Sequence, residues 1–302
     1  MNKMIEVKNV TKTFDGFKAL DDLSLTVEKG SVYGLVGPNG AGKTTLLKIL
    51  SGVYRQTQGE VKMLDEPVFE NLSVKNKMTF ISDDLFFFTS YTIKETAKLY
   101  AGIYKNWSWE RFNALKDVFK IDVNRKVKRL SKGMQKQVAF WLSISARPEI
   151  MLLDEPVDGL DPVMRRNVWK LMLQDVSEYK TTVLVSSHNL RELEDVCDHV
   201  GIVHQGKVVL EKALDDVKGL THKLQIAFDG EIPEKLLEEL KPLHTEKYGS
   251  VYMLIVKGEA ENLLKTAESY TPIILDIIPL TLEEIFIYEL GGLGYEFRNI
   301  II

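Results

Sequence analysis

A glycine-rich segment, GPNGAGKTT at residues 37–45, is the part of the sequence whose spacing predicts chemistry most directly. Four residues separate Gly37 from Gly42, Lys43 and Thr44, the spacing of a phosphate-binding loop. Small residues let backbone N–H groups converge on phosphate oxygens at a helix N-terminus, where the helix dipole also favours anions. A lysine here reaches the β- and γ-phosphates of a nucleotide, and the next hydroxyl ligates Mg²⁺. The expected phosphate-binding residues are Gly37, Pro38, Asn39, Gly40, Ala41, Gly42, Lys43, Thr44 and Thr45.

Two acids, Asp154 and Glu155, follow the apolar run IMLL at residues 150–153. A continuous apolar run that ends in acids is typical of a buried parallel strand. Downstream of a phosphate loop, Asp154 can hold Mg²⁺ through the metal's water shell, and Glu155 can orient or deprotonate an attacking water. Acids also occur at strand ends for structural reasons alone, and kinases and GTPases carry the same two motifs. The two segments predict a P-loop enzyme and leave its class open.

A third segment, RLSKGMQKQV at residues 129–138, distinguishes between these classes. It resembles the signature of ABC (ATP-binding cassette) ATPases, with Leu130, Ser131, Gly133 and Met134 matching and Lys132 where glycine is commoner. The resemblance covers about the first 215 residues. It implies that ATP and Mg²⁺ are the cofactors and that the nucleotide also contacts Ser131, Gly133 and Met134.

Three further matches extend the resemblance. Phe14 matches the aromatic residue that stacks on adenine, DGLD at 158–161 matches a loop that contacts a partner cassette, and His188 matches the family's switch histidine. The resemblance therefore implies that His188 holds the γ-phosphate and acts in catalysis with Glu155 and Lys43. Plainer alternatives are a core aromatic for Phe14, a helix N-cap for Ser131 and a surface histidine for His188.

The segment TFISDDLFFFTSYTIKE, Thr79–Glu95, departs from the family pattern, which has a glutamine here. Asp83 stands in the glutamine's place, or Ser82 or Asp84 if the register slips by one residue. The glutamine offers a neutral oxygen to Mg²⁺, whereas an aspartate keeps an oxygen ligand and adds a negative charge. We expect the metal to be held by Thr44, Asp83 and Asp154; alternatively, Asp83 is a solvated loop acid.

Hydrophobic patterns predict the elements that position these residues. Strands are expected at 4–10 and within 23–37, 149–156 and 181–188, and a hairpin at 200–212 turning at Gln205-Gly206. Helices are expected at 43–53, 92–104, 108–120 and 131–146. The resemblance implies an α/β fold, the P-loop NTPase ABC cassette, whose RecA-like core carries an antiparallel β-subdomain and a helical signature subdomain.

The pattern changes after residue 217. Strands at 221–230, 250–258 and 272–278 alternate with helices at 232–241, 259–269 and 281–290. We therefore expect an ATP-binding domain at 1–217 and a small C-terminal α/β domain at 218–302, which could dimerise, regulate or stabilise the protein.

Composition limits the possible partners and location. The chain of 302 residues has 39 Lys and Arg against 43 Asp and Glu, a net charge of −4, so nucleic acid is not expected as a partner. A single cysteine, Cys197, excludes an internal disulfide framework and suits a reducing cytosol. The sequence has neither the apolar run of about 18 residues that a spanning helix needs nor an apolar signal core at its start. The chain by itself is expected to be soluble and intracellular.

The resemblance implies a function in transport. Two cassettes, identical or different, would sandwich two ATP molecules and drive a separate transmembrane permease from the cytoplasmic face of the membrane, where the chain would be a peripheral protein. The closing stretch PLTLEEIFIYELGG at 279–292 resembles that of bacterial exporters, so export is the expected direction. Phe86, Phe87, Phe88 and Tyr91 lie where the family receives the permease, although internal packing would also explain these aromatics.

Two other functions of this family remain open alternatives. Cassettes of DNA repair carry long coiled-coil insertions and those of translation come in tandem; this sequence has neither feature. A degenerate subunit that does not hydrolyse ATP would fit the missing glutamine, but Glu155 and His188 argue against it.

Overall fold

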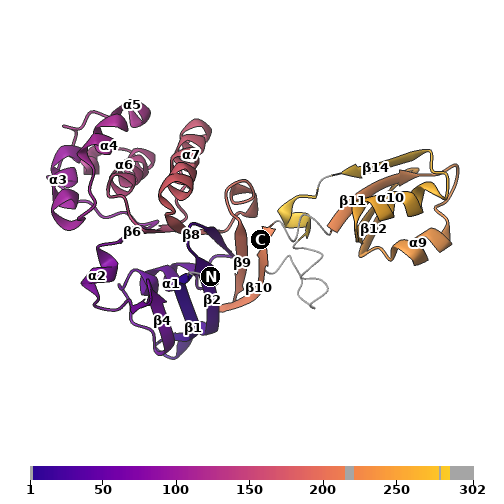
Figure 1. Cartoon of the computed structure of the whole chain (residues 1–302), viewed down its shortest axis with the longest axis horizontal. Helices are drawn as coiled ribbons and strands as arrows, with labels where there is room; N and C mark the ends of the chain where they lie inside the picture. The colour runs from indigo at the N-terminus through magenta and orange to yellow at the C-terminus, as the bar shows by residue number, and fades with distance from the viewer. Residues whose placement is uncertain (1–2, 215–220, 279, 286–302) are drawn as a thin grey trace. The chain divides into compact units, whose positions relative to one another are not determined.

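A computed structural model describes residues 3–214, 221–278 and 280–285 of the chain, which divides into two compact units, 1–211 and 212–302 (Figure 1). The expected boundary at 217/218 falls shortly after this division. Within the described residues, no helix combines the length and apolarity needed to cross a bilayer.

The first unit begins with an antiparallel sheet in the order β2-β1-β4-β5. Its strands are β1 (Lys3–Phe14), β2 (Phe17–Glu28), β4 (Gln58–Met63) and β5 (Glu66–Pro67). The two-residue turn between β1 and β2 is Asp15-Gly16, and both residues have positive φ, as the tight hairpin turn requires. This hairpin carries Phe14 and Phe17 at its tip.

A six-stranded sheet forms the centre of this unit, in the order β10-β9-β3-β8-β7-β6. Its strands are β3 (Val32–Val36), β6 (Met78–Ile81), β7 (Ile150–Asp154), β8 (Thr182–Ser187), β9 (His199–His204) and β10 (Lys207–Ala213). Strands β6, β7, β8, β3 and β9 pair in parallel. Every residue of β3, β7 and β8 is buried, as expected for parallel strands covered on both faces. The predicted turn at Gln205-Gly206 is confirmed, with both residues at positive φ.

Helices cover both faces of this sheet. Figure 1 shows α1 (Lys43–Leu50) and the antiparallel sheet on one side, with the later helices on the other. These later helices are α3 (Ile93–Ile103), α4 (Trp109–Ala114), α5 (Lys116–Phe119), α6 (Lys132–Ser145) and α7 (Pro162–Tyr179). The shorter elements are α2 (Leu72–Lys75) and the 3₁₀ turns η1 (Val127–Arg129) and η2 (Leu190–Glu192).

The helical part that carries the signature has an aromatic core of its own. The capping box predicted at Thr92 and Glu95 is confirmed at the start of α3. The single helix expected at 108–120 is instead two, α4 and α5, which meet at Leu115. Both pack on α6 because Trp141 stacks against Phe112 and Phe119, with ring centroids 4.7 and 5.6 Å apart. This packing fixes the position of α6 and of the signature at its start.

The second unit has a four-stranded antiparallel sheet in the order β12-β13-β11-β14. Its elements are β11 (Thr221–Ala227), α9 (Glu234–Leu240), β12 (His244–Tyr248), β13 (Val251–Lys257), α10 (Ala260–Glu268) and β14 (Ile274–Ile278). The succession βαββαβ in this strand order is the split βαβ, or ferredoxin-like, arrangement. Strand β12 was not among the expected elements. Of the helix expected at 281–290, only residues up to 285 lie in the described part, and 282–285 are helical.

Candidate nucleotide site

The glycine-rich loop connects β3 to α1 at the carboxyl edge of the parallel sheet. Two of its glycines are required by close approach of the backbone. A Cβ on Gly37 would lie 2.2 Å from the carbonyl oxygen of Val203. Gly42 has a φ of 110°, and a Cβ on it would lie 2.6 Å from the carbonyl oxygen of Ala19. The loop borders a pocket of about 370 Å³ lined by Phe14, Phe17, Ala19, Asn39, Gly40, Ala41, Gly42, Lys43, Thr44, Thr45, Asp83 and Glu155.

Lys43 is the buried cation of this pocket. Its Nζ donates to the carbonyl oxygens of Gly37 at 2.6 Å and Pro38 at 3.2 Å, and lies 3.5 Å from Glu155 Oε1. Burial lowers the pKa of Lys43, and the Glu155 carboxylate opposes this effect. The amine is thereby held beside the loop, where phosphate oxygens would replace the carbonyl groups as its partners.

Asp154 ends β7 beneath the same loop. Its Oδ1 accepts hydrogen bonds from Thr44 Oγ1 at 3.1 Å and Ser186 Oγ at 2.7 Å. Its Oδ2 is buried and has no hydrogen-bond partner among the described residues. A buried carboxylate oxygen normally requires a partner, and oxygen ligands suit Mg²⁺. The groups present at Thr44 and Asp154 therefore fit a magnesium ion.

The predicted catalytic pair, Glu155 and His188, also comes together. His188 Nδ1 lies 2.9 Å from Glu155 Oε2, and the His188 backbone N–H donates to the same oxygen at 3.3 Å. These two residues come from the ends of neighbouring strands, β7 and β8, whose carboxyl ends meet at this edge of the sheet. Asp158 offers a third ligand atom within 4.8 Å of those of Glu155 and His188. One carboxylate is thus placed between Lys43 and an exposed imidazole.

Aromatic side chains border the pocket at the hairpin tip. Phe14 is 38% exposed, which argues against a core position, and packs edge-on against Tyr54 with ring centroids 5.4 Å apart. Lys12 Nζ lies 4.7 Å from the centroid of the Phe14 ring. Phe17, which is 67% exposed, lines the pocket as well and is not among the site residues predicted from the sequence. The signal that could have found it is its place beside Phe14 across a two-residue turn.

The signature residues lie outside this pocket. Ser131 is the N-cap of α6 and accepts a hydrogen bond from the Met134 backbone N–H at 3.3 Å. A Cβ on Gly133 would be 2.5 Å from the Gly159 carbonyl oxygen, so the signature packs closely on the DGLD loop. Ser131, Gly133 and Met134 are absent from the lining around Lys43. The predicted nucleotide-binding residues therefore form two separate groups within one chain.

Asp83 lies between these two groups. It lines the pocket around Lys43 and also a neighbouring pocket of about 610 Å³ that borders α6. Asp84 lines only the second of these pockets, which supports the register with Asp83 in the glutamine's place. Asp83 Oδ1 accepts a hydrogen bond at 3.1 Å from Lys136 Nζ. Lys136, on α6, was not among the predicted site residues.

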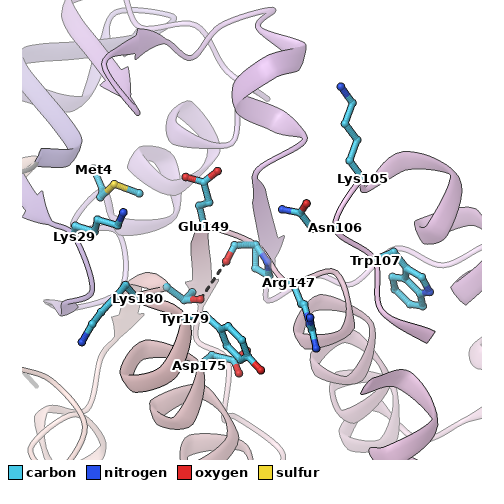
Figure 2. A pocket seen from close by; sticks show the side chains of 12 residues that line it. Met4, Lys29, Lys105, Asn106, Trp107, Arg147, Glu149, Asp175, Tyr179 and Lys180 are labelled. Carbon is cyan, nitrogen blue, oxygen red and sulfur yellow. Dashed lines mark hydrogen bonds between the residues drawn. The ribbon is translucent and has the colours of Figure 1, made fainter. Parts of the chain in front are cut away.

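Another cavity, of about 550 Å³, lies at the opposite edge of the parallel sheet, where β7 and β8 begin (Figure 2). Its buried acid, Asp175, pairs with Arg111, while burial raises the pKa of Asp175 to about 6. In Figure 2 the side chains of Lys29, Lys105 and Lys180 point in different directions and do not converge on one position. This cavity therefore lacks the convergent phosphate-binding groups of the loop at the other edge.

Comparison with known proteins agrees with the geometry. The family model for ABC transporters matches residues 20–158, which include the glycine-rich loop and both acids. The ABC transporter ATP-binding protein YtrB of Bacillus subtilis is 32% identical over 96% of this chain and 99% of its own length. The bacitracin transport ATP-binding protein BcrA of Bacillus licheniformis is 32% identical over 74% of each chain.

A solved structure of an ATP-binding subunit of an ABC transporter superposes with a TM-score of 0.67 at 25% identity, covering 71% of this chain and 92% of that one. The expected P-loop NTPase cassette fold is thereby confirmed. Because the match to the B. subtilis protein spans nearly the whole of both sequences, this chain belongs to the ABC transporter family as an ATP-binding and ATP-hydrolysing subunit.

Proposed function

We propose that this subunit pairs head to tail with a second cassette, identical or different, and uses the closing and opening of that pair to drive export through a separate membrane permease. The observation that carries this proposal is the separation of the signature from the chain's own nucleotide pocket. Lys43 and Thr44 of one cassette would bind each ATP together with Ser131 and Gly133 of the other. The pair would hold together only while the γ-phosphate connects the two sides, which makes ATP a ligand-driven switch.

The hydrolytic step would use groups that already lie within reach of one another. Thr44 and Asp154, with Asp83 beside them, would hold Mg²⁺, which when bound offsets the charge of the phosphates. Glu155 would accept the proton of the attacking water. His188, in contact with Glu155, would hold the γ-phosphate and stabilise charge in the transition state. Lys43 would bind the same phosphate from the loop side.

The exposed aromatics beyond Asp83 support a permease contact. Phe86 is 79% exposed and Phe88 49%, and their rings pack edge-on with centroids 5.6 Å apart. Tyr91 packs against Phe88 with centroids 5.0 Å apart. The expectation that Phe87 belongs to this surface is wrong, because Phe87 is 5% exposed and packs inside the protein. We propose that Phe86, Phe88 and Tyr91 bind the permease at the cytoplasmic face of the membrane.

Replacing Phe86 and Phe88 by alanine should release the subunit from membranes that contain its permease. The fraction that pellets with membranes should fall several-fold, because aromatic anchors commonly contribute about 2 kcal/mol or more each to an interface. The measurement is membrane fractionation after co-expression with the permease. ATP binding should be unchanged, because neither side chain lines the pocket around Lys43.

The matched control is Leu72→Ala, an apolar residue that is 74% exposed on α2. This variant should pellet as the unsubstituted protein does. Equal pelleting of the Phe86→Ala/Phe88→Ala variant and the control would contradict the assigned surface. The relative whose name refers to bacitracin transport supports transport as the process that the pair drives.

A further inference from the structure

Lys136 is a buried cation that joins three segments of the first unit. It lies on α6, five positions after Ser131, and is 6% exposed. Its Nζ donates to the backbone carbonyl oxygen of Glu155 at 2.6 Å and to Asp83 Oδ1 at 3.1 Å. Lysine is almost never this buried without partners, so both contacts are needed to offset its loss of water. The segments joined are the signature helix, the end of β7 and the loop after β6.

The contact with Glu155 bears on catalysis because the backbone of Glu155 is strained. Its φ is 44°, in the left-handed region that residues other than glycine rarely adopt. Such a conformation costs about 1–3 kcal/mol and persists only where neighbouring groups hold it. The backbone N–H of Glu155 donates to Ser186, and its carbonyl oxygen accepts from Lys136. Lys136 therefore holds one of the two peptide groups that flank the Glu155 α-carbon, and together these groups aim the Glu155 carboxylate.

The contact with Asp83 bears on nucleotide binding because of its charge. Asp83 and Glu155 line the same pocket, and Asp154 lies beneath it, so three carboxylates lie around the place where the phosphates of ATP would be. These like charges repel one another, and the repulsion is strongest where water is excluded. Lys136 neutralises Asp83 through Oδ1. The carboxylate still has a second oxygen that can face a metal.

We propose that Lys136 is a positioning residue for ATP hydrolysis, which fixes the backbone of Glu155 and neutralises Asp83. The two effects are separable: loss of the first lowers kcat, and loss of the second weakens ATP binding. The proposal rests on the assignment of Glu155 as the catalytic base.

The test is Lys136→Met, which keeps the apolar stem and removes the amine. We expect kcat to fall at least about tenfold, because small displacements of a catalytic group have large effects on rate. The Kd for Mg·ATP, measured by fluorescence of a labelled nucleotide, should rise about three- to tenfold, since Asp83 is 62% exposed and partly screened. Lys136→Arg should keep both values near those of the unsubstituted protein. Lys116→Met, at an exposed lysine of α5, is the control for loss of a charge.

A second substitution separates the two effects. Adding Asp83→Asn to Lys136→Met removes the unpaired charge but keeps an oxygen, so the Kd should return to within about twofold of its original value while kcat stays low. A kcat equal to that of the unsubstituted protein in either Lys136→Met variant overturns the proposal, as does a Kd that Asp83→Asn leaves unimproved. If Lys136→Met alone does not fold, the kcat of the double variant, which has no unpaired carboxylate at position 83, tests the proposal. A low kcat supports the role of Lys136, and an unchanged kcat overturns it. Glu155→Gln is assayed in parallel: full activity there would contradict the role of Glu155 itself, separately from Lys136.

Discussion

Glu155→Gln is expected to lower kcat for ATP hydrolysis about 10²- to 10⁴-fold while leaving ATP bound. The amide has the size of the carboxylate but cannot accept a proton from water. Lys43, Thr44 and Asp154, which would hold the phosphates and the metal, are unchanged. The nucleotide should therefore bind and remain intact, and the ATP-bound dimer should accumulate. The measurements are steady-state ATPase activity and size-exclusion chromatography with Mg·ATP.

Glu149→Gln is the matched control for this substitution. Glu149 precedes β7, at the opposite end of the strand from Glu155, and borders the other cavity. Its variant should hydrolyse ATP at the rate of the unsubstituted protein. Unreduced hydrolysis by Glu155→Gln would contradict its role as the base. A monomer that has ATP bound under all conditions would instead count against the dimer.

Lys43→Ala is expected to abolish most nucleotide binding. Removing one partner of a buried charge pair costs about 2–5 kcal/mol, so the affinity for Mg·ATP should fall at least about 30-fold. The reason is that Lys43 is the only lysine or arginine lining the pocket beneath the loop in the described part of the chain. Titration with a fluorescent ATP analogue measures the change.

Lys48→Ala, one turn and a half further along α1, is the control for Lys43→Ala. The Lys48 amine lies over the ring of Tyr54, 5.6 Å from its centroid, and does not line the pocket. Its variant should bind ATP with the original affinity. If Lys43→Ala retained that affinity too, the phosphates would not lie where the loop geometry places them.

Much of the candidate site could be predicted from sequence because its residues follow parallel strands. Asp154 ends β7, Glu155 and His188 come directly after β7 and β8, and Lys43 begins the helix that follows β3. Parallel strands end at a common edge, so residues far apart in the chain meet there. The spacing of the phosphate loop and of the acids, together with this rule, predicts that Thr44 and Asp154 lie close together. The choice of His188, which lies beside Glu155, depended instead on the resemblance to ABC ATPases.

Other features were not predictable for identifiable physical reasons. Strand β12, with the sequence HTEKY, lies at a sheet edge, has no buried residue and so shows no apolar alternation. Among three consecutive phenylalanines in an irregular loop, no period indicates that Phe87 alone is buried. A lysine on a helix is normally expected to extend its amine into solvent, so its place on a helix gives no reason to expect that Lys136 is buried. The one sequence signal for it was the unpaired negative charge that Asp83 introduces.

The most direct test of the account is to mix two inactive chains, each carrying Glu155→Gln to prevent turnover. One chain also carries Lys43→Ala, and the other carries Ser131→Arg, which places a bulky cation where the partner's phosphate would bind. Neither chain alone can form a complete site, but a head-to-tail pair of the two has one intact Lys43 facing one intact Ser131. Only the mixture is expected to form an ATP-dependent dimer, with one ATP retained per dimer. A mixture that stays monomeric with Mg·ATP, or either chain dimerising alone, would contradict a nucleotide site shared between two copies of this chain.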